Sequence, residues 1–310
     1  MRQRRAGLLG AALLSIAMLA SACGSSSGDD GAASASSGSP GSSGVTVVAS
    51  TNVYGDIVRQ VAGDKVTITS IISDPSADPH SYEANTRTQL ELSKANVVIE
   101  NGGGYDDFVD TMLKSANSKA KVLNAVEISG KTAGAGEELN EHVWYDLPSM
   151  SKLADQIASA LSAADPGNAA TYTANATAFQ HKLKELETTA AGIKSAHAGV
   201  SVAMTEPVPG YLLEACGLEN KTPEEFAEAI EEGTDVPAAA LQETLDLFIG
   251  KQVKLLAYNE QTTGPETEKV LQAAKDNKIA VVPVTETLPA GMDYVSWMSG
   301  NLAAIKAALG

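Results

Sequence analysis

Two of the four histidines in this 310-residue sequence lie where an imidazole could bind a ligand. His80 follows a β-branched run at residues 66–72, which predicts a buried strand, so it lies in the loop beyond the carboxyl end of that strand. Pro79 stiffens this loop. His142 follows a polar loop and precedes a predicted helix. Open α/β sheets bind small molecules and ions at such loops, so both histidines are candidate binding residues. The alternative for each is an ordinary solvated or packed histidine.

Two glutamates occupy matching positions in the second half of the chain. Glu206 follows an apolar run at residues 200–204, and Glu286 follows another at residues 279–284. Each run predicts a buried strand, so both carboxylates stand at carboxyl ends of strands. Glutamate is usually exposed, and either residue alone would be read as an ordinary surface acid. Their shared placement makes both of them candidate ligands.

Two imidazoles and two carboxylates form a mixed nitrogen and oxygen set that suits borderline divalent cations. Monodentate carboxylates would give four-coordinate zinc (Zn2+), and bidentate carboxylates would give the higher coordination number that suits manganese (Mn2+). Two glutamates neutralise a divalent ion, which lowers the cost of burying it. Because the protein supplies all four positions, no open position remains for a catalytic water. We therefore expect a binding protein and not an enzyme.

The elements that must position these residues form two similar halves. Predicted strands alternate with predicted helices over residues 45–164 and again over residues 198–310. Between them, residues 165–197 carry apolar side chains at helical spacing and predict one amphipathic helix about 45 Å long. The predicted fold is α/β, with two βα lobes of mainly parallel sheets joined by one long rigid helix. The four candidate ligands, two from each lobe, would meet in the interlobe cleft.

The first residues indicate export and anchoring. Residues 1–22 begin with arginines and continue with an apolar stretch too short for a membrane span, as in a signal peptide. Small residues lead to Cys23 and resemble a bacterial lipobox, although Ala20 stands where leucine is favoured. Residues 23–44 are rich in glycine and serine and predict a flexible, lipid-anchored tether. We expect an extracytoplasmic lipoprotein anchored to the cell membrane through Cys23, with a plain secretory signal as the alternative.

Charge and cysteine content limit the possible ligands. The net charge is −16, and removal of the signal takes away three arginines and no acid, which leaves −19. Such a charge argues against nucleic acid or anionic lipid as a partner and favours a cationic ligand. Besides Cys23 the only cysteine is Cys216, so the folded part has no intramolecular disulfide and no thiolate metal cluster. Any metal must therefore be bound by nitrogen and oxygen.

Several motifs together resemble a known family, and the resemblance covers nearly the whole mature chain. The motifs are Asp78-Pro79-His80, Asn101-Gly102-Gly103-Gly104, His142-Val143-Trp144, Thr205-Glu206-Pro207 and Val284-Thr285-Glu286-Thr287. They resemble the zinc- and manganese-binding solute-binding lipoproteins of bacterial ABC importers, the ZnuA/TroA-like family. Each motif alone would be weak, and the set is specific.

The resemblance implies that the metal ligands are His80, His142, Glu206 and Glu286. The fourth ligand of the family is usually aspartate, so Glu260 or water remains an alternative to Glu286. Many zinc-specific members carry a histidine-rich loop before the second histidine, whereas this chain has glutamates there. The hard ligands favour manganese and the Irving–Williams order favours zinc, so the choice between the two metals stays open.

The resemblance also implies a function. We expect capture of one divalent metal ion, Mn2+ or Zn2+, outside the membrane and its delivery to an ABC importer permease and its ATPase. The protein would work at the outer face of the cytoplasmic membrane, as a monomer and without nucleic acid. The rigid linking helix predicts small lobe motions. A metal-stabilised surface adhesin and a metal-dependent hydrolase are the alternatives.

Overall fold

The structure is a computed structural model that describes residues 44–74, 82–83, 85–134 and 138–310. Residues 1–22, Cys23 and His80 lie outside the described residues, as does all of the predicted tether except Gly44. None of the helices in the described ranges is both long and apolar enough to cross a membrane.

The first lobe is built on a four-stranded parallel sheet with strand order β2-β1-β3-β4. The four strands are short and rich in β-branched residues, which suits a sheet covered by helices. The strands are β1 (Thr46–Thr51), β2 (Thr67–Ile72), β3 (Val97–Glu100) and β4 (Lys121–Asn124). The helices are α1 (Asn52–Ala62), α2 (Thr86–Lys94), α3 (Phe108–Ser115), α4 (Ala125–Ser129) and α5 (Leu147–Ala164).

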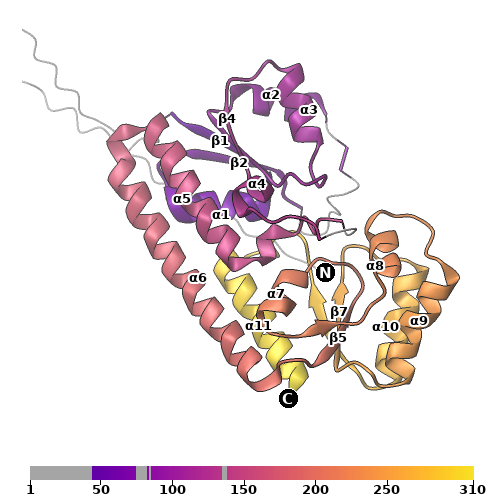
Figure 1. Ribbon diagram of the computed structural model, residues 1–310. Coiled ribbons are helices and arrows are strands. Elements are labelled where there is room, and N and C mark those ends of the chain that lie inside the picture. Colours follow the sequence, from indigo (N-terminus) through magenta and orange to yellow (C-terminus); the bar gives the residue numbers. More distant parts are fainter. Residues whose placement is uncertain (1–43, 75–81, 84, 135–137) are drawn as a thin grey trace, which may run out of the picture. The chain divides into compact units, whose positions relative to one another are not determined.

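The second lobe repeats this strand order, with a four-stranded parallel sheet in the order β6-β5-β7-β8. Its strands are β5 (Ser201–Met204), β6 (Glu219–Asn220), β7 (Leu255–Asn259) and β8 (Ala280–Val284). Its helices are α7 (Gly210–Ala215), α8 (Glu224–Glu231), α9 (Ala238–Ile249), α10 (Pro265–Asp276) and α11 (Tyr294–Leu309). The prediction of two parallel-sheet α/β lobes is confirmed (Figure 1).

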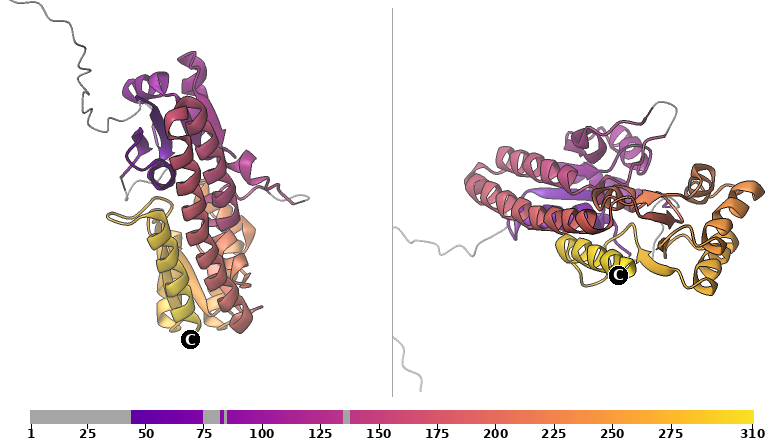
Figure 2. Two further views of the ribbon diagram at one scale, coloured as in Figure 1. Left: turned by 90° about the vertical axis from the view of Figure 1, so that its left-hand side faces the viewer. Right: turned by 60° about the horizontal axis from the view of Figure 1, so that its bottom comes forward.

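One long helix joins the two sheets, as predicted. A 3₁₀ turn at Pro166–Asn168 precedes α6 (Ala169–His197), whose 29 residues span about 43 Å. Helix α6 packs against α1 and α5 of the first lobe and against α7 and α11 of the second. Figure 2 shows α6 alongside α5 and α11. Its buried side chains belong to a hydrophobic core shared by both lobes, so α6 supports the two sheets together.

The polypeptide that leads into α11 ties the lobes together a second time. The Asn52 side chain donates to the carbonyl oxygen of Leu288 at 2.9 Å and accepts from the Leu288 amide at 2.8 Å. The Asp56 carboxylate accepts from the amide of Tyr294 at 2.9 Å, and the Tyr294 hydroxyl donates to the carbonyl oxygen of Trp144 at 2.6 Å. These contacts join first-lobe residues to the last helix of the chain.

Candidate metal site

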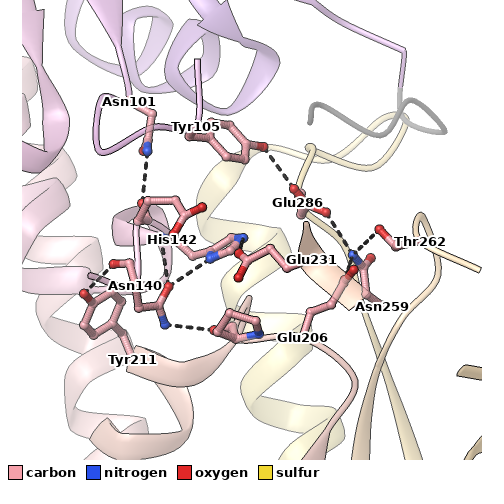
Figure 3. A network of polar contacts seen from close by, with 12 residues as sticks. Asn101, Tyr105, Asn140, His142, Glu206, Tyr211, Glu231, Asn259, Thr262 and Glu286 are labelled. Atoms are coloured by element: carbon pink, nitrogen blue, oxygen red, sulfur yellow. Dashed lines mark hydrogen bonds and ion pairs between the residues drawn. The ribbon is translucent and has the colours of Figure 1, made fainter. Parts of the chain in front are cut away.

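The carboxyl edge of the second sheet brings two of the predicted ligands together. Glu206 follows β5, Asn259 ends β7, and Glu286 follows β8. The side-chain amide of Asn259 donates to the Glu206 carboxylate and, at 2.9 Å, to Oε1 of Glu286 (Figure 3). The two glutamates are only 3% and 1% exposed. Asn259 was not predicted from the sequence, where the adjacent Glu260 was the candidate, and the side chain of Glu260 is exposed.

The first lobe reaches this edge through the glycine-rich turn after β3. Gly102, Gly103 and Gly104 all have positive φ angles, and a Cβ on Gly102 would lie 2.2 Å from the Asn124 side chain. The turn places Tyr105 so that its hydroxyl donates to Oε2 of Glu286 at 3.2 Å. Glycine is therefore required for the turn that brings this tyrosine to the second lobe.

His142 is completely buried and its ring is oriented by Asn140. The Oδ1 atom of Asn140 accepts from the His142 amide at 3.0 Å and contacts Nδ1 of the ring at 2.9 Å. Because an amide oxygen only accepts hydrogen bonds, this contact assigns the hydrogen to Nδ1 and leaves the lone pair on Nε2. That tautomer is the one in which Nε2 can bind a cation.

Asn140 also connects His142 to the second lobe. Its Nδ2 donates to the carbonyl oxygen of Pro207 at 2.9 Å, one residue beyond Glu206. The hydroxyl of Tyr211, on α7, donates to the Asn140 carbonyl oxygen at 2.6 Å. Asn140 was not predicted from the sequence, where its one signal is a polar side chain two residues before a candidate ligand.

A further carboxylate, Glu231, comes from the end of α8. Its Oε1 lies 3.5 Å from Nε2 of His142. Among the described residues, Glu141, His142 and Glu231 form the group whose possible ligand atoms all lie within 4.8 Å of one another. Glu206 and Glu286 are outside that group, although Figure 3 shows them on the other side of Glu231. Glu231 was not predicted from the sequence, because the acids of α8 resemble a solvated helix face.

The charges around Glu231 change its ionisation. Burial, and then the negative charges of Glu141, Glu206 and Glu286, raise the pKa of Glu231 to about 10. A hydrogen bond with Glu141 acts in the same direction. The same surroundings that favour a proton on this carboxyl group also favour a bound cation.

An acidic cavity opens beside these residues. Its volume is about 730 Å³, and its lining includes Glu138, Glu141, Glu228, Glu231 and Glu232. A concave surface lined by one sign of charge concentrates ions of the opposite sign. The cavity therefore favours cations, in agreement with the negative net charge of the whole chain.

The donors around the cleft suit one kind of ligand. An imidazole nitrogen with buried carboxylates binds borderline divalent metals such as Zn2+ and Mn2+. Of the four predicted ligands, the structure describes His142, Glu206 and Glu286, and His80 lies outside the described residues. Glu286 is 1% exposed, whereas the alternative Glu260 is exposed.

Comparison with known proteins gives one family. The family model described as "Zinc-uptake complex component A periplasmic" (ZnuA) matches residues 47–308. The manganese-binding lipoprotein MntA of Halalkalibacterium halodurans is 27% identical over 175 residues, 56% of this chain and 55% of that protein. The metal ABC transporter substrate-binding lipoprotein SloC of Streptococcus mutans is 34% identical over 152 residues, 46% and 49% of the two chains. This chain therefore spans about half the length of these curated relatives.

Solved structures share the fold. The periplasmic zinc-binding protein TroA from Treponema pallidum superposes with a TM-score of 0.74 at 19% identity, covering 86% of this chain and 99% of that one. At this identity the match establishes the two-lobed architecture with its long helix.

Proposed function

Because this chain belongs to the zinc-uptake component A (ZnuA) family, we propose that it captures a divalent transition metal ion outside the cytoplasmic membrane and delivers it to an ABC-type import permease. The observation that carries this proposal is the pair of buried carboxylates, Glu206 and Glu286, held together by Asn259 near a buried imidazole. Burying carboxylates this close together is unfavourable unless a cation or a proton compensates their charge.

The proposed ligands are His80, His142, Glu206 and Glu286. The orientation of His142 by Asn140 supports its role, because it directs the ring lone pair to Nε2. The burial of Glu286 and its hydrogen bond from Tyr105 support it over Glu260 as the fourth ligand. Two glutamates would make a site with a divalent ion formally neutral.

The proposed cargo is Mn2+ or Zn2+. Relatives and structural neighbours are named for both metals, as a manganese-binding lipoprotein and as a periplasmic zinc-binding protein. The nitrogen and oxygen donors suit either ion, and zinc generally binds more tightly to such donors. A preference for zinc at equilibrium would therefore not by itself exclude manganese as the imported ion.

The proposed location is the outer face of the cytoplasmic membrane. Cys23 would carry the lipid and residues 23–44 would form the tether, which agrees with relatives that are named lipoproteins. The partners would be the importer permease and its ATPase, and the protein would act as a monomer. Members of this family are substrate-binding components, so we propose no enzymatic activity.

Uptake measurements test this function. Cells lacking the gene should accumulate less radioactive manganese or zinc from dilute medium, and the wild-type gene should restore uptake. A gene carrying His142→Ala should not restore uptake although the protein is produced. Unchanged uptake of both metals in the deletion strain would argue against the proposal.

A further inference from the structure

We propose that the cleft contains a second cation position, formed by Glu141, Glu231 and Nε2 of His142, which an incoming divalent ion occupies before it reaches Glu206 and Glu286. This inference rests on the proposed function and deepens it, because it concerns how the same ion enters. Two of its three ligands, Glu141 and Glu231, are indicated by neither the motifs nor the strand ends.

The geometry of the three side chains fits one ion. Two ligand atoms bound to a tetrahedral ion at about 2.1 Å lie about 3.4 Å apart. Nε2 of His142 and Oε1 of Glu231 are 3.5 Å apart, and Glu141 supplies a ligand atom within 4.8 Å of both. Small side-chain movements would bring all three donors onto a common ion.

The imidazole distinguishes this group from an ordinary acidic cluster. His142 is 0% exposed, and its ring is held by Asn140 so that Nε2 faces Glu231 (Figure 3). Glu231 is itself largely buried, with 12% of its side chain exposed. One neutral nitrogen donor and two carboxylates form a ligand set suited to zinc or manganese.

The position of the acidic cavity gives the order of binding. Glu141 and Glu231 line the 730 Å³ cavity, whereas Glu206 and Glu286 are not among the described residues that line it. A cation that enters through this cavity therefore meets the outer pair of carboxylates first. Because Nε2 of His142 can bind one ion at a time, the two positions exclude each other. The ion would move inward by exchanging Glu141 and Glu231 for Glu206 and Glu286.

The direct test isolates the outer position. In the double variant Glu206→Gln and Glu286→Gln, equilibrium dialysis with Zn2+ should still detect one ion, bound more weakly than by the wild type. Adding Glu231→Gln should abolish this binding. Adding Glu225→Gln instead should preserve it, because Glu225 is an exposed residue of α8 that is not among the described residues lining the cavity, and its substitution removes the same charge. No ion in the double variant, or an ion insensitive to Glu231→Gln, would overturn the inference.

A kinetic measurement decides the matter if the double variant does not fold. In the otherwise unchanged protein, Glu231→Gln should slow metal association measured by stopped-flow competition with a chromogenic chelator, and Glu225→Gln should slow it less. Equal rates in the two variants would overturn the inference. Failure of the wild type to bind any metal would instead contradict the proposed function, so the two failures are distinguishable.

Discussion

Asn140 fixes the ring of His142 through a single oxygen atom, which contacts both the backbone nitrogen and Nδ1 of that histidine. The contact determines which ring nitrogen is left to bind a cation. The first lobe thus presents His142, its candidate ligand among the described residues, in a defined orientation.

Substitution of Asn140 tests this orienting role. Asn140→Ala should weaken metal binding by about 10- to 100-fold, the usual cost of losing a group that orients a metal ligand. Asn140→Asp should recover part of that loss, because a carboxylate still accepts from Nδ1. Titration calorimetry would measure both affinities. Equal affinities for Asn140→Ala and the wild type would show that His142 needs no such support.

Asn259 holds the two buried carboxylates together in the metal-free protein. Asn259→Asp would replace the donated hydrogen bonds with a third negative charge. The free energy of unfolding of the metal-free protein should therefore fall by about 1–3 kcal/mol. Bound metal should reduce this loss, because the cation neutralises the added charge. Urea unfolding with and without metal would measure both effects.

A matched control for this substitution is Asn277→Asp, at the end of α10, where the side chain donates one hydrogen bond to Ala273. Its loss of stability should be smaller and should not depend on metal. The same metal dependence in both variants would contradict a special role for Asn259.

The buried carboxyl group of Glu100 should make the stability of the protein depend on pH. Burial raises the pKa of this carboxyl group from 4.5 to about 7, and the charges of Asp106 and Asp110 add to the effect. The folded state therefore binds more protons than the unfolded state between these pH values, so stability should fall as the pH rises through this window. The fall should be complete above about pH 7.

The variant Glu100→Gln should remove this part of the pH dependence, as judged by urea unfolding from pH 4.5 to above pH 7. Glu243→Gln, at an exposed position on α9, should leave it unchanged. A pH profile that is identical for Glu100→Gln and the wild type would contradict the burial argument.

The connections behind the cleft predict small motions on metal release. Helix α6 packs against both lobes, and the Asn52 side chain makes two hydrogen bonds with the backbone of Leu288. A large hinge rotation would break these contacts, so we expect local rearrangement of loops. Small-angle scattering should give the same radius of gyration with and without metal. A clear compaction on metal binding would contradict this expectation.

Much of the fold follows from local sequence patterns. Alternating strands and helices predicted two parallel sheets, and apolar spacing predicted the long helix, although a 3₁₀ turn at Pro166–Asn168 precedes α6. Strand ends also indicated Glu206 and Glu286 as candidates, and the structure places both at the carboxyl edge of the second sheet, after the strands on either side of β7. These inferences needed only short-range information.

The rest of the site depends on tertiary contacts that no local pattern records. Glu231 is one of several acids on α8, and only the packing of that helix beside His142 distinguishes it from its neighbours. Asn140 and Asn259 are polar residues near chain turns, and their importance comes from bonds to residues more than 25 positions away in the sequence, such as Pro207 and Glu286. Such partners become visible only when the chain is folded.

Metal stoichiometry tests the central claim most directly. The purified protein, stripped of metal and then offered Mn2+ and Zn2+ together, should retain one equivalent of tightly bound divalent metal by elemental analysis. Glu206→Gln and Glu286→Gln should each lose this tight binding, whereas Glu260→Gln should keep it. Retention by Glu286→Gln with loss in Glu260→Gln would reassign the fourth ligand. A wild-type protein that retains no metal would contradict the account.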